Sequence, residues 1–265
     1  MTKGAGWRNN RQPALFYRED KSKTMNSQNE KKIGPFNLGQ ILVGIFAIIF
    51  LIAGGMTISN LTVDADKAIR ELRTEVGANG GAGTLDFALL TEKNKDIVAW
   101  IYADGTSIDY PVLQGTDNEF YRTHLFNGKK KGNGSIFMDS AAKADFSDRN
   151  TVIYGRNMKD GTMFGCLEEY QAQDFYEAAP VMMLYTPDGS YAVELICGTK
   201  ESAGFLPKTA FDSDEDFLAY VEEARGRSTF MSDTELLPGD RIVTLCTWES
   251  GSNGIYVLTG KLVRQ

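Results

Sequence analysis

Hydrophobic and polar positions alternate in short runs through residues 84–265. Each run is bounded by Gly, Asn, Asp or Pro, and bounded runs rich in β-branched and aromatic residues are typical of strands. Two segments have helical spacing instead, at 162–171 and 214–228. Many strands and few helices predict a mainly β domain, a barrel or a sandwich with peripheral helices. The runs are DIVAWIYA (96–103), SIDYPVLQ (107–114), GSIFMD (134–139), NTVIYG (150–155), VMMLYTP (181–187), YAVELICGT (191–199), DRIVTLCTW (240–248) and GIYVLTGKLV (254–263).

A long apolar run lies nearer the N-terminus. Residues 38–58 contain no charged side chain. At about 1.5 Å per residue, a helix of this length spans the roughly 30 Å hydrocarbon core of a bilayer. A cleaved signal peptide is the alternative, although its apolar region usually has about 7–15 residues. We therefore predict one transmembrane anchor over residues 35–61.

Charge is distributed unevenly on the two sides of this run. Residues 1–34 carry eight basic and three acidic side chains, a net charge of +5. Because the whole chain has a net charge of −7, residues 35–265 have a net charge of −12. Because basic flanks stay on the cytoplasmic side, we expect a disordered cytoplasmic tail over 1–34 and an extracellular domain at the cell membrane. The acidic domain argues against nucleic acid as its partner.

Residues 62–83 join the anchor to the domain. Ala68, Ile69, Leu72 and Val76 recur at helical spacing, which predicts a juxtamembrane helix over 64–76. The following GANGGAG (77–83) ends that helix and forms a linker. The structured domain is expected over 84–265.

The chain contains three cysteines, Cys166, Cys197 and Cys246. An odd number of cysteines argues against a disulfide framework. Because none of them has CxxC spacing, we expect no metal site, and we expect no cofactor. Cys246 lies late in an apolar run, before the polar turn ESGSNG, where a cleft at a sheet rim could reach its sulfur. It is therefore a candidate nucleophile, with a buried inert cysteine as the alternative, as for Cys166 and Cys197.

Motifs in order along residues 64–265 resemble those of class B sortases. The resemblance implies an eight-stranded β-barrel and a membrane-anchored cysteine transpeptidase. Members of the family cut a surface protein at its sorting signal, hold it as a thioester, and transfer it to an amine of the cell wall. The motifs are NKDIVAWIYADGTSIDYPVLQGTDNEFYRTHLFNGKKKGNGSIFMD (94–139), FSDRNTVIYGRNMKDGTMFGCLEEY (146–170), DRIVTLCTWE (240–249) and YVLTGKL (256–262).

The sequence departs from this family at the histidine and at the nucleophile. Where the family has IYGHNM with the acid–base histidine, this chain has IYGRNM, and Arg156 takes that place. The family's TLSTC ends in the nucleophile, whereas this chain has TLCTW. Aligning the motifs from their first residues puts Trp248 at the nucleophile position. Aligning CTWE of this chain with CTYE of the family puts Cys246 there instead. The two alignments differ by two residues, about 6–7 Å along a strand, and leave Cys246 on the same face.

The third family residue is an arginine that steadies the substrate and the developing oxyanion. In this chain Ile255 stands in its place and can donate no hydrogen bond. Arg156 stays protonated and cannot act as a base. General acid–base help is worth about 10²–10⁴-fold and an oxyanion donor about 10²–10³-fold. The departures therefore predict that the family's reaction is lost or strongly impaired.

Three hypotheses about function remain open. One is a pseudosortase, whose cleft binds a sorting-signal peptide or an active sortase without cutting. Another is an active cysteine transpeptidase, in which Arg156 is a cation that favours the Cys246 thiolate and a cell-wall precursor is the acceptor. The last is a structural scaffold at the cell surface.

Two further motifs receive no role. His124 is the only histidine, and it lies in a segment for which the resemblance implies no catalytic part. FLPKTAF (205–211) contains text like a sorting signal, but it lies in the middle of the domain, so the similarity is interpreted as a coincidence.

Overall fold

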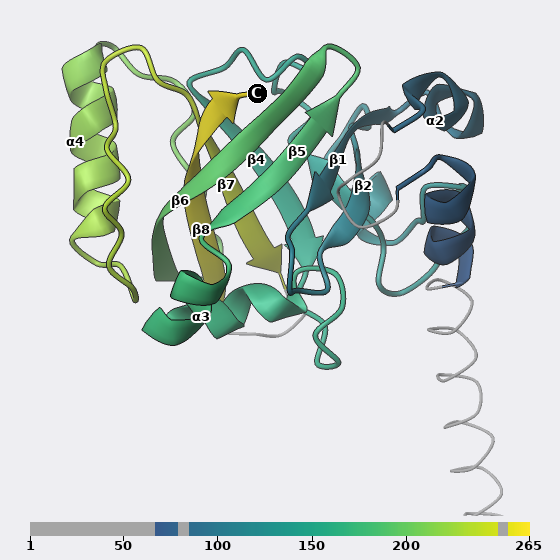
Figure 1. Ribbon diagram of the computed structural model, residues 1–265, viewed down its shortest axis with the longest axis horizontal. Helices are drawn as coiled ribbons and strands as arrows, with labels where there is room; N and C mark the ends of the chain where they lie inside the picture. The colour runs from purple at the N-terminus through teal and green to yellow at the C-terminus, as the bar shows by residue number, and fades with distance from the viewer. Residues whose placement is uncertain (1–66, 79–84, 249–253) are drawn as a thin grey trace, which may run out of the picture. The chain divides into compact units, whose positions relative to one another are not determined.

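Residues 67–78, 85–248 and 254–265 are described by the computed structural model. In these ranges eight strands close into one barrel, with the order β1-β2-β3-β4-β7-β8-β6-β5 (Figure 1). β2 and β3 pair in parallel, as do β4 and β7, and the other neighbours are antiparallel. The strands are β1 (Ile97–Tyr102), β2 (Asp109–Leu113), β3 (Ile136–Met138), β4 (Asn150–Arg156), β5 (Val181–Thr186), β6 (Gly189–Ser202), β7 (Ile242–Trp248) and β8 (Gly254–Arg264). The prediction of a mainly β, eight-stranded barrel is confirmed.

Side chains along β7 point alternately to the inside of the barrel and to its outer surface. Val243 and Leu245 belong to the main hydrophobic core that fills the barrel. Cys246 instead packs with Val152 and Val257 in a separate small cluster. Since successive side chains of a strand point to opposite faces, Cys246 lies on the outer face of the barrel wall.

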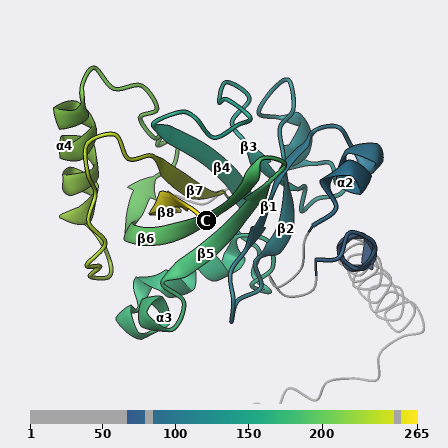
Figure 2. The same ribbon diagram turned by 45° about the horizontal axis from the view of Figure 1, so that its top comes forward.

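Helices surround the barrel, with α4 and α2 on opposite sides in both views (Figures 1 and 2). Ser213 caps α4 by accepting a hydrogen bond from the Asp216 amide, and Phe217 and Val221 of α4 are buried. They cover the outer face of β6 and β7 at Ile196, Cys197 and Ile242. The helices are 67–75, α2 (Phe87–Lys93), η1 (Phe120–Arg122), η2 (Gly165–Gln171), α3 (Gln173–Ala178) and α4 (Asp214–Arg225).

The helix predictions are confirmed in part. The segment predicted over 214–228 forms α4, which ends at Arg225 before Gly226. The segment predicted over 162–171 forms only the 3₁₀ helix η2, preceded by Met163 with a φ of 53°. The helices α2 and α3 were not predicted, because each is short and its apolar positions are too few to show a period.

The predicted N-terminal segments lie mostly outside the described residues. This holds for the tail (1–34), the anchor (35–61) and the linker beyond residue 78. The juxtamembrane helix predicted over 64–76 is present at 67–75, and its first residues are not described. Within the three described ranges, no helix combines the length and apolarity that a membrane crossing requires.

Candidate active site

The register of β4 and β7 fixes where the predicted site residues lie. Cys246 pairs with Tyr154, and Trp248 pairs with Arg156. Cys246 and Arg156 therefore lie on neighbouring strands but two positions apart, a separation of about 6–7 Å along the strands. The residue level with Arg156 is Trp248.

The Cys246 thiol lies at a cavity of about 260 Å³ outside the barrel wall. The residue is only 1% exposed, and its sulfur forms no disulfide. Burial raises the pKa of the Cys246 thiol well above its ordinary value, and the carboxylates of Asp139 and Glu201 raise it further. The thiol therefore stays protonated at neutral pH. The cavity is lined by Asn118, Glu119, Arg122, Phe137, Tyr154, Gly204, Phe205, Leu206, Cys246, Thr247 and Ile255.

Tyr154 and Asp139 form a polar pair beside this thiol. The Tyr154 hydroxyl donates to Asp139 Oδ2 at 3.2 Å, and Asn118 Nδ2 donates to the same oxygen at 3.2 Å. Burial raises the pKa of Tyr154, and the negative charge of a Cys246 thiolate or of the Asp139 carboxylate would raise it further. Tyr154 therefore keeps its proton and cannot take one from the thiol. The sequence analysis missed this pair, although Tyr154 lies two residues before Arg156 on the same face of β4.

Arg156, at the end of β4, donates a hydrogen bond from Nη1 to the backbone carbonyl of Gly132. This contact ties the end of β4 to the loop between η1 and β3. Arg156 is absent from the residues that line the cavity of Cys246. The role of Arg156 as the cation that activates this thiol stays a prediction.

Ile255, at the start of β8, does line the cavity of Cys246. It contributes hydrocarbon where the family resemblance implies an arginine. His124 lies elsewhere: its ring stacks on Phe120 at 4.1 Å, and its Nδ1 is 2.8 Å from the Phe120 carbonyl oxygen. The only histidine of the sequence is thus not among the residues around the thiol.

The connection between β6 and α4 forms the outer wall of the site. Phe205 and Leu206 line the Cys246 cavity, and Leu206 also lines an adjoining cavity of about 380 Å³ with Pro207 and Tyr154. The connection is fixed to the barrel, since Asn150 Nδ2 donates to the Lys208 carbonyl at 2.8 Å. The segment 205–211 therefore forms part of the site, which the sequence analysis did not predict.

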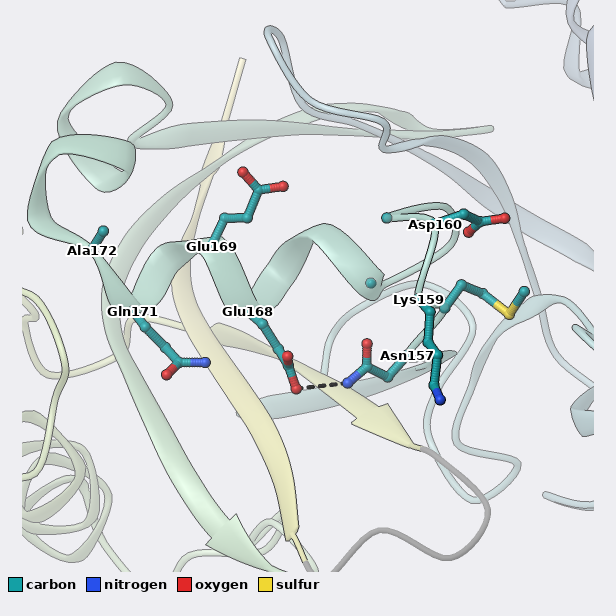
Figure 3. Close-up of a pocket in the computed structure, with 10 residues that line it drawn as sticks. Asn157, Lys159, Asp160, Glu168, Glu169, Gln171 and Ala172 are labelled. Atoms are coloured by element: carbon teal, nitrogen blue, oxygen red, sulfur yellow. Dashed lines mark hydrogen bonds between the residues drawn. The ribbon is translucent and has the colours of Figure 1, made fainter. Parts of the chain in front are cut away.

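A separate, open hollow of about 830 Å³ lies just past the end of β4. Figure 3 shows Asn157 and Glu168 pointing toward each other across it, and Asn157 Nδ2 donates to Glu168 Oε1 at 2.6 Å. Glu169 and Asp160 carry further negative charge at its edge, and Lys159 carries positive charge. The hollow is polar and does not include Cys246 or Arg156 among its lining residues.

Comparisons with known proteins place this chain in a family. No family model matches the chain. Sortase B of Listeria monocytogenes is 37% identical over 178 residues, which are 66% of this chain and 72% of that protein. Sortase B of Staphylococcus aureus is 36% identical over 183 residues, 67% and 75% of the two chains. The solved S. aureus sortase B–substrate complex has a TM-score of 0.71 and 30% identity, covering 79% of this chain and 99% of the other. The chain therefore belongs to the class B sortase family.

Proposed function

We propose that this chain is a pseudosortase, a sortase-like protein that binds an extended peptide and does not transfer it efficiently. The observation that carries the proposal is the setting of Cys246. Its thiol is buried, the charges of Asp139 and Glu201 raise its pKa, and the only histidine of the sequence does not line its cavity. Attack on a peptide carbonyl requires the thiolate, and carboxylates together with burial favour the neutral thiol.

The second half of the family reaction meets the same difficulty. A leaving amine needs a proton, and an incoming amine must lose one. Arg156 cannot take up a proton, and Tyr154, whose hydroxyl donates to Asp139, holds its proton more firmly than a free tyrosine. Without an acid–base group, the rate falls by about 10²–10⁴-fold before the thiol itself is considered.

The ability to bind a peptide is supported by the cavities. Those of about 260 and 380 Å³ share Tyr154 and Leu206, so they follow one another along the outer face of the barrel. Aromatic and aliphatic side chains line both, together with charged groups, Glu119 and Arg122 in the first and Asp139 and Asp148 in the second. The S. aureus sortase B solved as a substrate complex has the same fold. A sorting-signal peptide of a surface protein is the proposed ligand, and the corresponding segment of a protein that engages an active sortase is the proposed alternative.

The proposal includes the arrangement of the whole chain. Residues 35–61 anchor it in the cell membrane as a single span, residues 1–34 remain in the cytoplasm, and the barrel over 84–265 lies outside the cell. The support is the uncharged run 38–58 and the net charge of +5 before it. A cleft outside the membrane would meet surface proteins as they leave the cell.

The test separates peptide binding from chemistry. The full chain, purified in detergent, is incubated with a panel of fluorescent sorting-signal peptides, and anisotropy and intact mass are measured. We expect saturable binding without a mass increase, and the same affinity in Cys246→Ala. A thioester adduct or a cleaved peptide that disappears in Cys246→Ala would establish an active transpeptidase instead.

Two leucines provide a matched pair of variants for the binding site. Leu206 is 77% exposed and lines both cavities, whereas Leu237 is 55% exposed and lines neither of them. We expect Leu206→Arg to weaken peptide binding at least tenfold and Leu237→Arg to leave it unchanged. Lack of binding by the unmodified chain to every peptide would favour a structural scaffold.

A further inference from the structure

A lysine-rich loop interrupts the acidic surface of the barrel. Residues 127–134, here called the lysine loop, have the sequence NGKKKGNG and contain no acidic residue. They lie in a part of the chain, residues 35–265, whose net charge is −12. Lys129 and Lys130 are exposed, and Lys131 is half-buried. The exposed positive charges of Lys129 and Lys130 on an acidic domain favour an anionic partner for this loop.

The lysine loop is held in one conformation by its backbone. The Leu125 amide donates to the Lys129 carbonyl at 2.9 Å, and the Lys131 amide donates to the Thr123 carbonyl at 2.7 Å. Gly134 has a φ of +61°, and a Cβ there would lie 2.4 Å from the Tyr121 carbonyl oxygen, so only glycine fits. Arg156 adds its hydrogen bond to the Gly132 carbonyl. The lysines are thus presented on a fixed hairpin, and binding costs little backbone entropy.

The base of the lysine loop lies against the helix 67–75. Ile69 of this helix shares a narrow gap of about 10 Å³ with Leu125, Asn133 and Gly134. Ile69 also packs against the hydrophobic core. The helix and the base of the lysine loop therefore lie side by side.

The same helix is tied by sequence to the apolar run. Eight residues, 59–66, separate the end of that run at Ile58 from Lys67. A fully extended segment of this length spans at most about 29 Å. If residues 35–61 are the anchor of the proposed function, the lysine loop lies within reach of the bilayer surface.

We propose that the lysine loop binds the anionic headgroups of the membrane in which the chain is anchored. The inference rests on the anchor in the proposed function and adds the contact that orients the barrel. Near an anionic surface, each lysine favours the bound arrangement by about fivefold. Residues 64–75 carry four acidic and three basic side chains, a net charge of −1, so the lysine loop supplies the attraction. Bound headgroups would hold the Arg156 end of β4 close to the membrane.

The test uses the full chain in nanodiscs of neutral phosphatidylcholine or of phosphatidylcholine with phosphatidylglycerol. Acetylation of each lysine is followed by mass spectrometry. We expect acetylation of Lys129 and Lys130 to slow about threefold or more in the anionic nanodiscs and to recover in 0.5 M salt. Lys200, exposed on β6, serves as the internal control and should react equally in both.

A pair of triple variants separates the effect of the lysine loop from the effect of the net charge. Hydrogen exchange of backbone amides 128–135 should slow in anionic nanodiscs for the unmodified chain and for K95Q/K143Q/K200Q. The K129Q/K130Q/K131Q variant, with the same change in charge, should lose this effect. Equal exchange in neutral and anionic nanodiscs would overturn the proposal. Protection by soluble polyphosphate but not by lipid would overturn it in favour of an anionic polymer. A chain that does not enter nanodiscs at all would instead refute the anchor, and with it this contact.

Discussion

Ile255 and Cys246 line one cavity, and the isoleucine contributes only hydrocarbon to it. Burial and two carboxylates raise the pKa of the thiol, so a guanidinium at position 255 would act in the opposite direction. Each unit by which the pKa falls gives about ten times more thiolate. We expect Ile255→Arg to increase the rate of iodoacetamide alkylation of Cys246 at pH 8 about tenfold, measured on its peptide by mass spectrometry.

The control for this variant is Ile255→Gln, which is polar but uncharged. It brings no positive charge to the cavity, so alkylation should remain within about twofold of the unmodified chain. Equal acceleration by both substitutions would show that access, not charge, limits the thiol. Transfer activity should not appear in either variant, since neither supplies an acid–base group.

Sequence and structure contribute different residues to this site. Ile255 and Cys246 were found from the sequence because each stands within a recognisable family motif. Asp139 and Phe205 were not, because their approach to Cys246 depends on strand register and on the path of the β6–α4 connection. Residues far apart in sequence meet there through tertiary contacts, which no local pattern encodes.

At the scale of elements, the strands were predicted well because alternation and turn residues are local signals. The strands β4, β7 and β8 coincide closely with the predicted runs NTVIYG, DRIVTLCTW and GIYVLTGKLV. The segment around η2 was predicted as a helix without its type, because Met163, Leu167 and Tyr170 have turn spacing that both α and 3₁₀ helices produce over so few residues. Closure of the strands into a barrel rather than a sandwich followed only from the family resemblance.

Gly155 joins Tyr154 to Arg156 on β4 and faces the core. A Cβ at this position would lie 2.4 Å from Phe164 Cδ2, and the Phe164 side chain is fully buried. Since overpacking a filled core costs about 1–3 kcal/mol, we expect Gly155→Ala to lower the free energy of unfolding by that amount. Urea unfolding of the full chain in detergent, followed by tryptophan fluorescence, measures the change.

Gly132 provides the matched glycine. No heavy atom lies within 4 Å of a Cβ built there, so Gly132→Ala should change the free energy of unfolding by less than about 0.5 kcal/mol. A loss of stability in Gly155→Ala no larger than in Gly132→Ala would mean that Phe164 yields to the methyl group. β4 would then tolerate larger side chains than its packing implies.

At the scale of the whole molecule, the three cysteines share one property. All are buried and free, and burial raises the pKa of each thiol, for Cys197 to about 11. In the unfolded chain a thiol has a pKa of about 8.5. The folded state therefore binds more protons than the unfolded state once the pH exceeds about 8.5. The stability that the thiols contribute is complete below that value and is lost as the pH rises toward the folded pKa values.

We expect the free energy of unfolding of the full chain to fall between pH 8.5 and 10, by up to about 1.4 kcal/mol per pH unit for each thiol. Urea unfolding at half-unit steps measures the slope, and Cys197→Ala should reduce it by the share of one thiol. Val193→Ala, a buried change on the same strand without a titrating group, should lower stability equally at every pH. A slope that Cys197→Ala leaves unchanged would mean that Cys197 gives up its proton in the folded chain as readily as in the unfolded one. Its burial under α4 would then be too loose to exclude water.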